Sequence, residues 1–106
     1  MATTPDYIDF VCDQICGAGD IRYRKMFGEY MIYINDKPVL LVCDNTVFVK
    51  IVPELDSVME GAEKGFPYEG AREHYVLDIE DTEKARAVIA ILEPITPLPK
   101  RRSGKK

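Results

Sequence analysis

The sequence predicts an α+β domain in which an antiparallel sheet of about five strands combines with helices. One observation is the alternation between positions 22 and 51, which follows the two-residue period of strands whose faces have different surroundings. Another is a pair of turn sequences, Asn35-Asp36 and Asp44-Asn45, whose residue types tolerate the positive φ of tight hairpins. A third is a helical pattern near each end. Together they predict a four-strand meander, one further strand and flanking helices.

The first helix is predicted over residues 5–16, because apolar residues recur there at the i, i+3, i+4, i+7 spacing of one buried face. The residues of that face are Ile8, Val11, Cys12 and Ile15. Thr4 is placed to cap the helix, and Pro5 suits its first position. The Gly17-Ala18-Gly19 sequence ends it. Because these glycines follow a helix and precede a strand, they have the wrong order for a phosphate-binding loop.

Five strands are expected along the middle of the chain, over residues 21–27, 30–35, 39–43, 46–51 and 74–79. Pro38 cannot donate a hydrogen bond to a neighbouring strand, so it belongs where the third strand begins. Leu40, Leu41 and Val42 are consecutive, so at least one of them points away from the face that the helices cover. Exposed apolar sheet is typical of an interface.

Two further segments link the meander to the end of the chain. Residues 53–63 are expected to form a short helix with Leu55, Val58 and Met59 turned inward. The loop over residues 65–72 carries Phe66 and Tyr68, which we expect to plug the edge of the core. The alternative is that these aromatics contact a partner, because binding residues concentrate on loops held by a rigid scaffold.

The last helix is expected to begin with Asp81 or Thr82 as its cap and to reach Pro94, where the pattern must break or bend. Its buried stripe is Ala85, Val88, Ile89 and Leu92. We therefore predict one domain over residues 1–93. Residues 94–106 are predicted to be a disordered tail that is first proline-rich and then basic.

Charge is distributed unevenly along the 106 residues. Residues 1–99 carry 9 Lys or Arg against 18 Asp or Glu, whereas the remaining seven residues carry five cations and no carboxylate side chain. An acidic body repels phosphate backbones, so nucleic-acid binding would have to come from the tail or from a local patch. The tail residues that would make such contacts are Lys100, Arg101, Arg102, Lys105 and Lys106.

One local basic patch lies in the body, where Arg22, Arg24 and Lys25 are interleaved with aromatic residues. Aromatic rings between cations can stack bases and contact phosphates. Strand aromatics more often pack against residues of the next strand, and we expect packing for Tyr23, Phe27 and Tyr30.

Few residues of this sequence suit catalysis. His74 is the only histidine, no motif positions a base around it, and nucleotide-binding fingerprints are missing. The three cysteines, Cys12, Cys16 and Cys43, are expected to be reduced core thiols, because their spacing does not resemble that of a zinc site. We therefore expect a non-enzymatic protein without a cofactor or metal. The N-terminus lacks a secretion signal and no apolar run could span a bilayer, so we expect no membrane partner and a cytoplasmic location.

The sequence resembles the N-terminal domain family of TfoX, also called Sxy, which are regulators of natural competence in bacteria. The resemblance is carried by Arg24, Met26-Phe27-Gly28, Tyr30, Ile32-Tyr33, the Asn35-Asp36 turn, the strand that ends at Cys43, Asp44, Val49-Lys50 and the loop Pro67-Tyr68-Glu69-Gly70-Ala71. Many family members have glycine where Glu29, Met31 and Asp36 stand. The full-length competence regulators also carry a C-terminal domain with no counterpart in these 106 residues.

The resemblance implies a two-layer fold in which helices pack on one face of the sheet. It supplies no established catalytic residues. Its motif residues Arg24, Met26, Phe27, Gly28, Tyr30, Tyr33, Tyr68 and Gly70 are candidates for binding. The expected function is a regulatory module that binds a protein partner, of which a homodimer is the simplest form. Nucleic-acid binding through the tail, and a small-ligand or enzymatic pocket that uses Tyr68, Arg72 or His74, are the alternatives.

Overall fold

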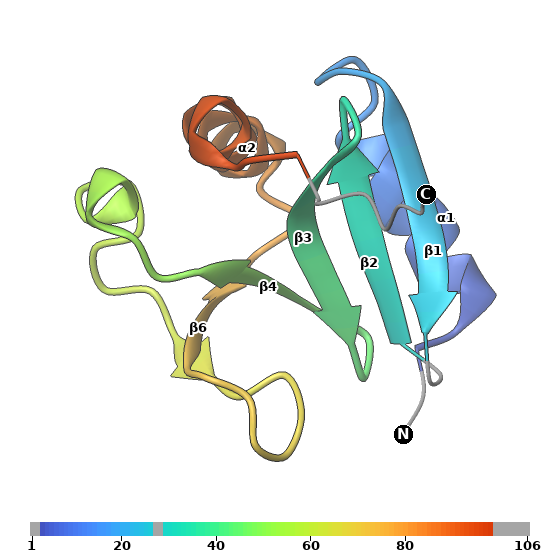
Figure 1. The fold of residues 1–106 in the computed structure, drawn as a ribbon, viewed down its shortest axis with the longest axis horizontal. Coiled ribbons are helices and arrows are strands. Elements are labelled where there is room, and N and C mark those ends of the chain that lie inside the picture. Colours follow the sequence, from blue (N-terminus) through green and yellow to red (C-terminus); the bar gives the residue numbers. More distant parts are fainter. Residues whose placement is uncertain (1–2, 27–28, 99–106) are drawn as a thin grey trace, which may run out of the picture.

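The computed structural model describes residues 3–26 and 29–98, which form one sheet with helices on one side (Figure 1). The elements in chain order are α1 (Pro5–Gln14), β1 (Ile21–Met26), β2 (Glu29–Ile34), β3 (Lys37–Cys43), β4 (Thr46–Lys50), the 3₁₀ helix η1 (Pro53–Leu55), β5 (Lys64–Gly65), β6 (His74–Leu77) and α2 (Thr82–Ile95). The predicted α+β class is confirmed.

The described residues form a sheet of six strands in the order β1-β2-β3-β4-β6-β5, and every neighbouring pair is antiparallel. Strands β1 to β4 form the predicted meander, β6 returns to lie beside β4, and the two-residue β5 closes the far edge. In Figure 1, β4 runs across the direction of β1, β2 and β3, which is the accumulated right-handed twist of neighbouring strands.

The hairpin turns have the predicted chemistry. Asn35 and Asp36 have φ values of 53° and 69°, and Asp44 and Asn45 have φ values of 52° and 54°. A two-residue turn with positive φ at both central positions matches the twist of the strands it joins, and Asn and Asp tolerate this conformation better than other residues with a side chain. These turns therefore set the register of the meander.

Both helices pack on the same face of the sheet and share one core with it; Figure 1 shows α1 behind β1 and β2. The helical side chains of this core are Ile8, Val11, Ile15, Ala85, Val88, Ile89 and Leu92. The strand side chains are Tyr30, Ile32, Ile34, Val39, Leu40, Val42, Val47, Val49, Tyr75 and Leu77. The predicted stripe of α2 is confirmed, and so is the arrangement with helices on one face.

The helix caps follow from short polar side chains. The Thr4 hydroxyl accepts a hydrogen bond from the backbone N–H of Tyr7 at 3.2 Å, and the Asp81 carboxylate accepts one from Lys84 at 3.1 Å. The two helices are 10 and 14 residues long, and no helix within the described ranges has the length and apolar character to cross a membrane. The last helix ends at Ile95, two residues beyond the predicted domain boundary.

The helix predicted over residues 53–63 is wrong. Only Pro53–Leu55 is helical, as a 3₁₀ turn without a side-chain cap, and the chain then turns as far as Gly61, whose φ is +78°. Leu55 and Met59 are nevertheless buried, as the pattern predicted. Tertiary burial of these two side chains does not require a regular helix, and the following residues contribute β5, a strand that the sequence pattern did not indicate.

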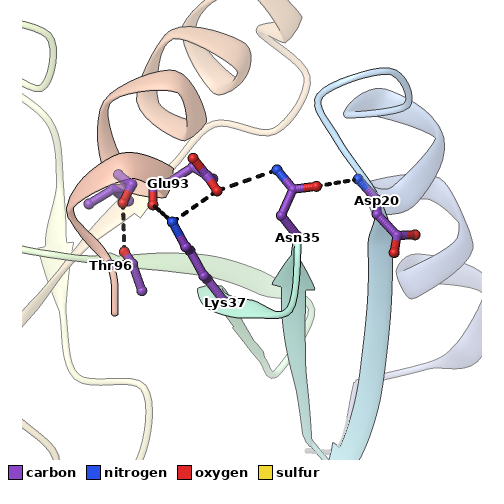
Figure 2. Close-up of polar contacts among 6 residues, drawn as sticks. Asp20, Asn35, Lys37, Glu93 and Thr96 are labelled. Atoms are coloured by element: carbon purple, nitrogen blue, oxygen red, sulfur yellow. Dashed lines mark hydrogen bonds and ion pairs between the residues drawn. The ribbon is translucent and has the colours of Figure 1, made fainter. Parts of the chain in front are cut away.

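A chain of polar contacts fastens the end of α2 to the β2–β3 turn (Figure 2). Lys37 donates to the backbone carbonyl of Glu93 at 3.0 Å and forms an ion pair with its carboxylate at 3.1 Å. Asn35 donates to the Glu93 carboxylate at 3.3 Å and accepts from the backbone N–H of Asp20 at 2.9 Å. One turn thereby holds both α2 and the entry to β1 in place.

Candidate protein-interaction surface

A line of paired residues crosses the sheet on the face opposite the helices. Arg24 of β1 pairs with Met31 of β2, which pairs with Leu41 of β3; Leu41 pairs with Phe48 of β4, which pairs with Val76 of β6. We call Met31, Leu41, Phe48 and Val76 the apolar row. Side chains alternate between the faces of a strand, and both chain neighbours of each row residue belong to the helix-side core. The row therefore faces away from the helices.

The open face is defined by the apolar row and the side chains beside it on the same side of the sheet. Its members are Arg22, Arg24, Glu29, Met31, Tyr33, Leu41, Phe48, Lys50, His74 and Val76. Met31, Leu41 and Val76 are partly exposed, whereas Phe48 is only 7% exposed. The Phe48 ring makes an edge contact with the His74 ring, with centroids 6.5 Å apart. The centre of the face is thus apolar, and neighbouring strand residues shield it only in part.

Cations lie beside this apolar centre, on β1 and at the end of β4. Arg22 lies 3.5 Å from the Asp20 carboxylate, but both side chains are more than half exposed, so the ion pair is weak. Arg24 and Lys50 are exposed, and within the described ranges neither forms an ion pair. The open face is therefore cationic although the body of the chain is acidic.

One end of the sheet is closed by polar contacts around Glu29. Its carboxylate accepts hydrogen bonds from the Thr3 hydroxyl at 2.9 Å and from the backbone N–H of Asp44 at 3.0 Å. Beneath them Cys43 is 1% exposed. Burial raises the pKa of the Cys43 thiol to about 11, with smaller contributions from Glu29 and Asp44. Glu29 is thus engaged in structure, and Cys43 is a poor nucleophile at neutral pH.

A cleft of about 450 Å³ lies between α1, the β3–β4 turn and the end of β6, and it shares one lining residue, Val76, with the apolar row. Its chemically distinctive lining residues are Tyr7, Phe10, Glu63, Asp78, Glu80 and Lys84. Burial raises the pKa of the Tyr7 phenol, and the Glu80 and Asp78 carboxylates raise it further. Two aromatic rings beside three carboxylates suit a small organic cation. The pocket predicted to use Tyr68, Arg72 or His74 is not this cleft, because none of those residues lines it.

Comparison with known families gives a match between the TfoX N-terminal domain model and residues 13–90. The chain belongs to this family. A similar protein, described as an uncharacterized 12.7 kDa protein in the trpE 5′ region of Spirochaeta aurantia, is 34% identical over 107 residues, which cover 99% of this chain and 93% of that protein. The match to the TfoX N-terminal domain family begins in α1 and ends in α2, so it includes the whole open face.

The residues of the TfoX motif do not converge on one site. Arg24 and Tyr33 lie on the open face, whereas Tyr30 points toward the helices and is 5% exposed. Tyr30 also makes an edge contact with Tyr23 at 5.5 Å between centroids, which supports the predicted packing role of these aromatics. Met26 ends β1, and Phe27 and Gly28 lie outside the described residues. The motif therefore specifies the meander at least as much as a binding site.

The prediction that the aromatic residues of the TfoX-type loop between β5 and β6 plug the edge of the core is wrong. Phe66 is 64% exposed and Tyr68 is 59% exposed, so they do not plug the core. Pro67 between them is buried instead, which turns both aromatic side chains outward. Gly70 follows with a φ of +85°. No sequence pattern distinguishes the buried residue from the two exposed ones, because all three are apolar and lie outside any strand.

Other predicted functional residues have separate outcomes. The tail cations Lys100, Arg101, Arg102, Lys105 and Lys106 lie outside the described residues, so nucleic-acid binding through them stays a prediction. Cys12, Cys16 and Cys43 are free thiols, but the prediction that all three belong to the core is wrong, because Cys43 is buried, Cys12 is partly buried and Cys16 is exposed. In the part of the chain that the structure describes, no group of three His, Cys, Asp or Glu residues could hold a metal ion. The apolar row, with Leu41 as its only anticipated member, is what sequence reasoning missed.

Proposed function

We propose that this chain is a non-catalytic regulatory module that binds a protein partner through its open face. The apolar row supports the proposal. An antiparallel sheet with one face toward solvent usually has polar residues there, whereas this chain places Met31, Leu41 and Val76 in line across the middle of that face. Apolar surface with a polar rim is characteristic of protein interfaces.

The chemistry of the open face favours binding over catalysis. The Nδ1 atom of His74 lies 2.7 Å from the backbone carbonyl of Arg72, so one ring nitrogen is engaged locally. The raised pKa of Cys43 keeps that thiol protonated near neutral pH. A nucleophile and a general base within reach of each other would favour an enzyme; the geometry of this face instead favours shape and charge complementarity.

The test is affinity capture from cells that natively express the chain, with wild type beside Leu41→Asp and Ile51→Asp. Leu41 is on the open face, whereas Ile51 is an exposed apolar residue that follows β4 and lies outside that face. We expect one protein to be captured by wild type and by Ile51→Asp but not by Leu41→Asp. After purification, this protein should bind the purified wild-type chain directly.

A second substitution guards against misfolding in that experiment. Val76→Thr keeps a β-branched residue that suits a strand but adds a hydroxyl to a partly exposed position, and circular dichroism should show a native fold while capture is weakened. Equal capture of the same proteins by wild type, Leu41→Asp and Val76→Thr would contradict the proposal.

A second candidate function is the binding of a small organic cation in the cleft beside Tyr7. The observation that favours it is the convergence of Asp78 and Glu80 on that phenol within an aromatic-lined cleft. Arginine amide is a suitable probe for calorimetry. Glu80→Gln should weaken its binding, whereas Glu83→Gln on the outer side of α2 should not; equal affinities for both variants would exclude the cleft.

A further inference from the structure

We propose that the partner of the open face is an acidic protein segment with apolar side chains, and neither a second copy of this chain nor a nucleic acid. This inference rests on the proposed function of the open face. It names the chemical class of the partner from the charges around the apolar row.

Cations lie at the β1 end of the apolar row and beside its Phe48 position. Arg24 is the β1 member of the same line of pairs, and Lys50 lies beside Phe48 on β4 and pairs with His74 on β6. Neighbouring strands are about 4.8 Å apart, so the line from β1 to β6 is about 19 Å long. An occupant that covers the row therefore meets positive charge at its β1 end and along one side near Phe48, and carboxylates at those positions would be attracted.

The sole carboxylate among the described strand residues of this face does not compensate these cations. Glu29 lies at the closed end, where Thr3 and the backbone of Asp44 already donate to it. Arg24 and Lys50 are therefore available to carboxylates of a partner. Lys25, the neighbour of Arg24, has its side chain on the opposite side of β1 and supplies a matched control.

A second copy is a poor occupant because it presents the same charges. Two-fold pairing of one open face with another would place cationic rims together, and like charges across an interface oppose association. Docking onto the acidic surface of a second copy would instead be a head-to-tail contact, which extends into larger assemblies as concentration rises. Light scattering separates these cases.

A nucleic acid is also a poor occupant. Single-strand-binding surfaces use exposed aromatic rings as stacking platforms. On the open face Phe48 is only 7% exposed, which leaves the partly exposed Tyr33 as the one Phe or Tyr ring available for stacking among the described strand residues of that face. Arg22 already has Asp20 as a neighbour, and the body carries an excess of carboxylates. The open face combines apolar contact with a few cations, which suits a protein segment.

The experiment uses the full chain and three labelled peptides of equal length with the same leucine spacing. The other positions of the three peptides are all Glu, all Gln or all Lys. An oligothymidine of similar length is the fourth probe. We expect the Glu/Leu peptide to bind about tenfold more tightly than the Gln/Leu peptide at low salt, since a few exposed ion pairs of ordinary strength multiply to that factor. The preference should fall as salt is added.

Variants locate the effect on the open face. Arg24→Glu combined with Lys50→Glu should remove the preference for the Glu/Leu peptide and give one for the Lys/Leu peptide. Lys25→Glu combined with Lys64→Glu changes the charge equally away from the open face and should leave the preference unchanged. Leu41→Ala should weaken binding of both the Glu/Leu and Gln/Leu peptides.

Each other outcome overturns this inference in a recognisable way. Equal binding of the Glu/Leu and Gln/Leu peptides would reject the acidic partner. An absence of peptide binding, while capture still depends on Leu41, would reject it too. In both cases the proposed function of the open face would be unaffected. Preference for oligothymidine would make the face a nucleic-acid surface. A concentration-dependent oligomer abolished by Leu41→Asp would make a second copy the occupant. Loss of the Leu41 dependence in capture would instead remove the proposed function itself.

Discussion

Leu40 and Leu41 are adjacent in the sequence, yet they belong to different surroundings. Leu40 is fully buried between the sheet and the helices, whereas Leu41 is partly exposed on the open face. Their residue type and strand are the same, so the alternation of side chains along β3 makes the whole difference. The core that stabilises the fold therefore lies on the helix-covered face, whereas the open face stays partly exposed to solvent.

The sharpest test of this comparison is the pair Leu40→Ala and Leu41→Ala. Leu40→Ala removes a fully buried side chain from the core, so we expect a loss of about 2–5 kcal/mol in the free energy of unfolding. Leu41→Ala should cost less than about 1.5 kcal/mol, because its side chain is already partly hydrated. Urea denaturation measures both. Equal losses would mean that something covers the open face in the isolated chain.

Substitutions of Asn35 test the polar contacts that join the β2–β3 turn to α2 and to the entry of β1 (Figure 2). Asn35→Gly keeps a residue suited to a φ of 53° but removes the hydrogen bonds with Asp20 and Glu93, and we expect a loss of about 1 kcal/mol. Asn35→Ala should cost about 1 kcal/mol more, because alanine is strained at positive φ. Thermal unfolding of both variants measures the difference, and equal melting temperatures would refute the role of backbone strain.

The stability that the Glu93 contacts contribute should depend on pH. Hydrogen bonds from Lys37, and then from Asn35, lower the pKa of Glu93 from its usual value of 4.5. A group whose pKa is lower in the folded state adds stability above its unfolded pKa and loses it as pH falls through the folded value. Wild type should therefore be slightly more stable than Glu93→Gln at pH 7, and the gap should shrink below pH 4.5. A gap that is constant from pH 7 to pH 3 would contradict this account.

The smallest effects are expected in the β5–β6 loop, which belongs to neither face. Phe66→Ser and Tyr68→Ser should change the free energy of unfolding by no more than about 0.5 kcal/mol, because both side chains are mostly exposed. A loss of several kcal/mol in chemical denaturation would restore the idea that these aromatics plug the core.

Much of the meander could be predicted because its determinants are local. The two Asn/Asp turns set strand positions, the capping residues Thr4 and Asp81 set helix starts, and the period of α2 set its buried stripe. Residues 53–63 could not be predicted in the same way. There the burial of Leu55 and Met59 is compatible with a helix or with irregular turns, and only packing decides between them.

The apolar row was harder to foresee because it depends on pairings between distant residues. The Asp44-Asn45 turn implies that Leu41 pairs with Phe48. The pairing of Met31 with Leu41 depends on a bulge, since Ile32 pairs with Leu40 but the next residue of β2 pairs with Pro38. Adding Val76 further requires that β6 joins β4. These choices are tertiary, and no local pattern specifies them.

Binding of an acidic, leucine-containing segment to the open face can be tested by titrating the full chain with the Glu/Leu peptide while observing methyl signals by NMR. We expect the signals of Met31, Leu41 and Val76 to shift together as the peptide is added, whereas those of Leu40 and Ile32, on the other side of the sheet, stay in place. Shifts confined to the helix-covered side or to the cleft around Tyr7 would contradict this expectation, as would an unchanged spectrum at saturating peptide.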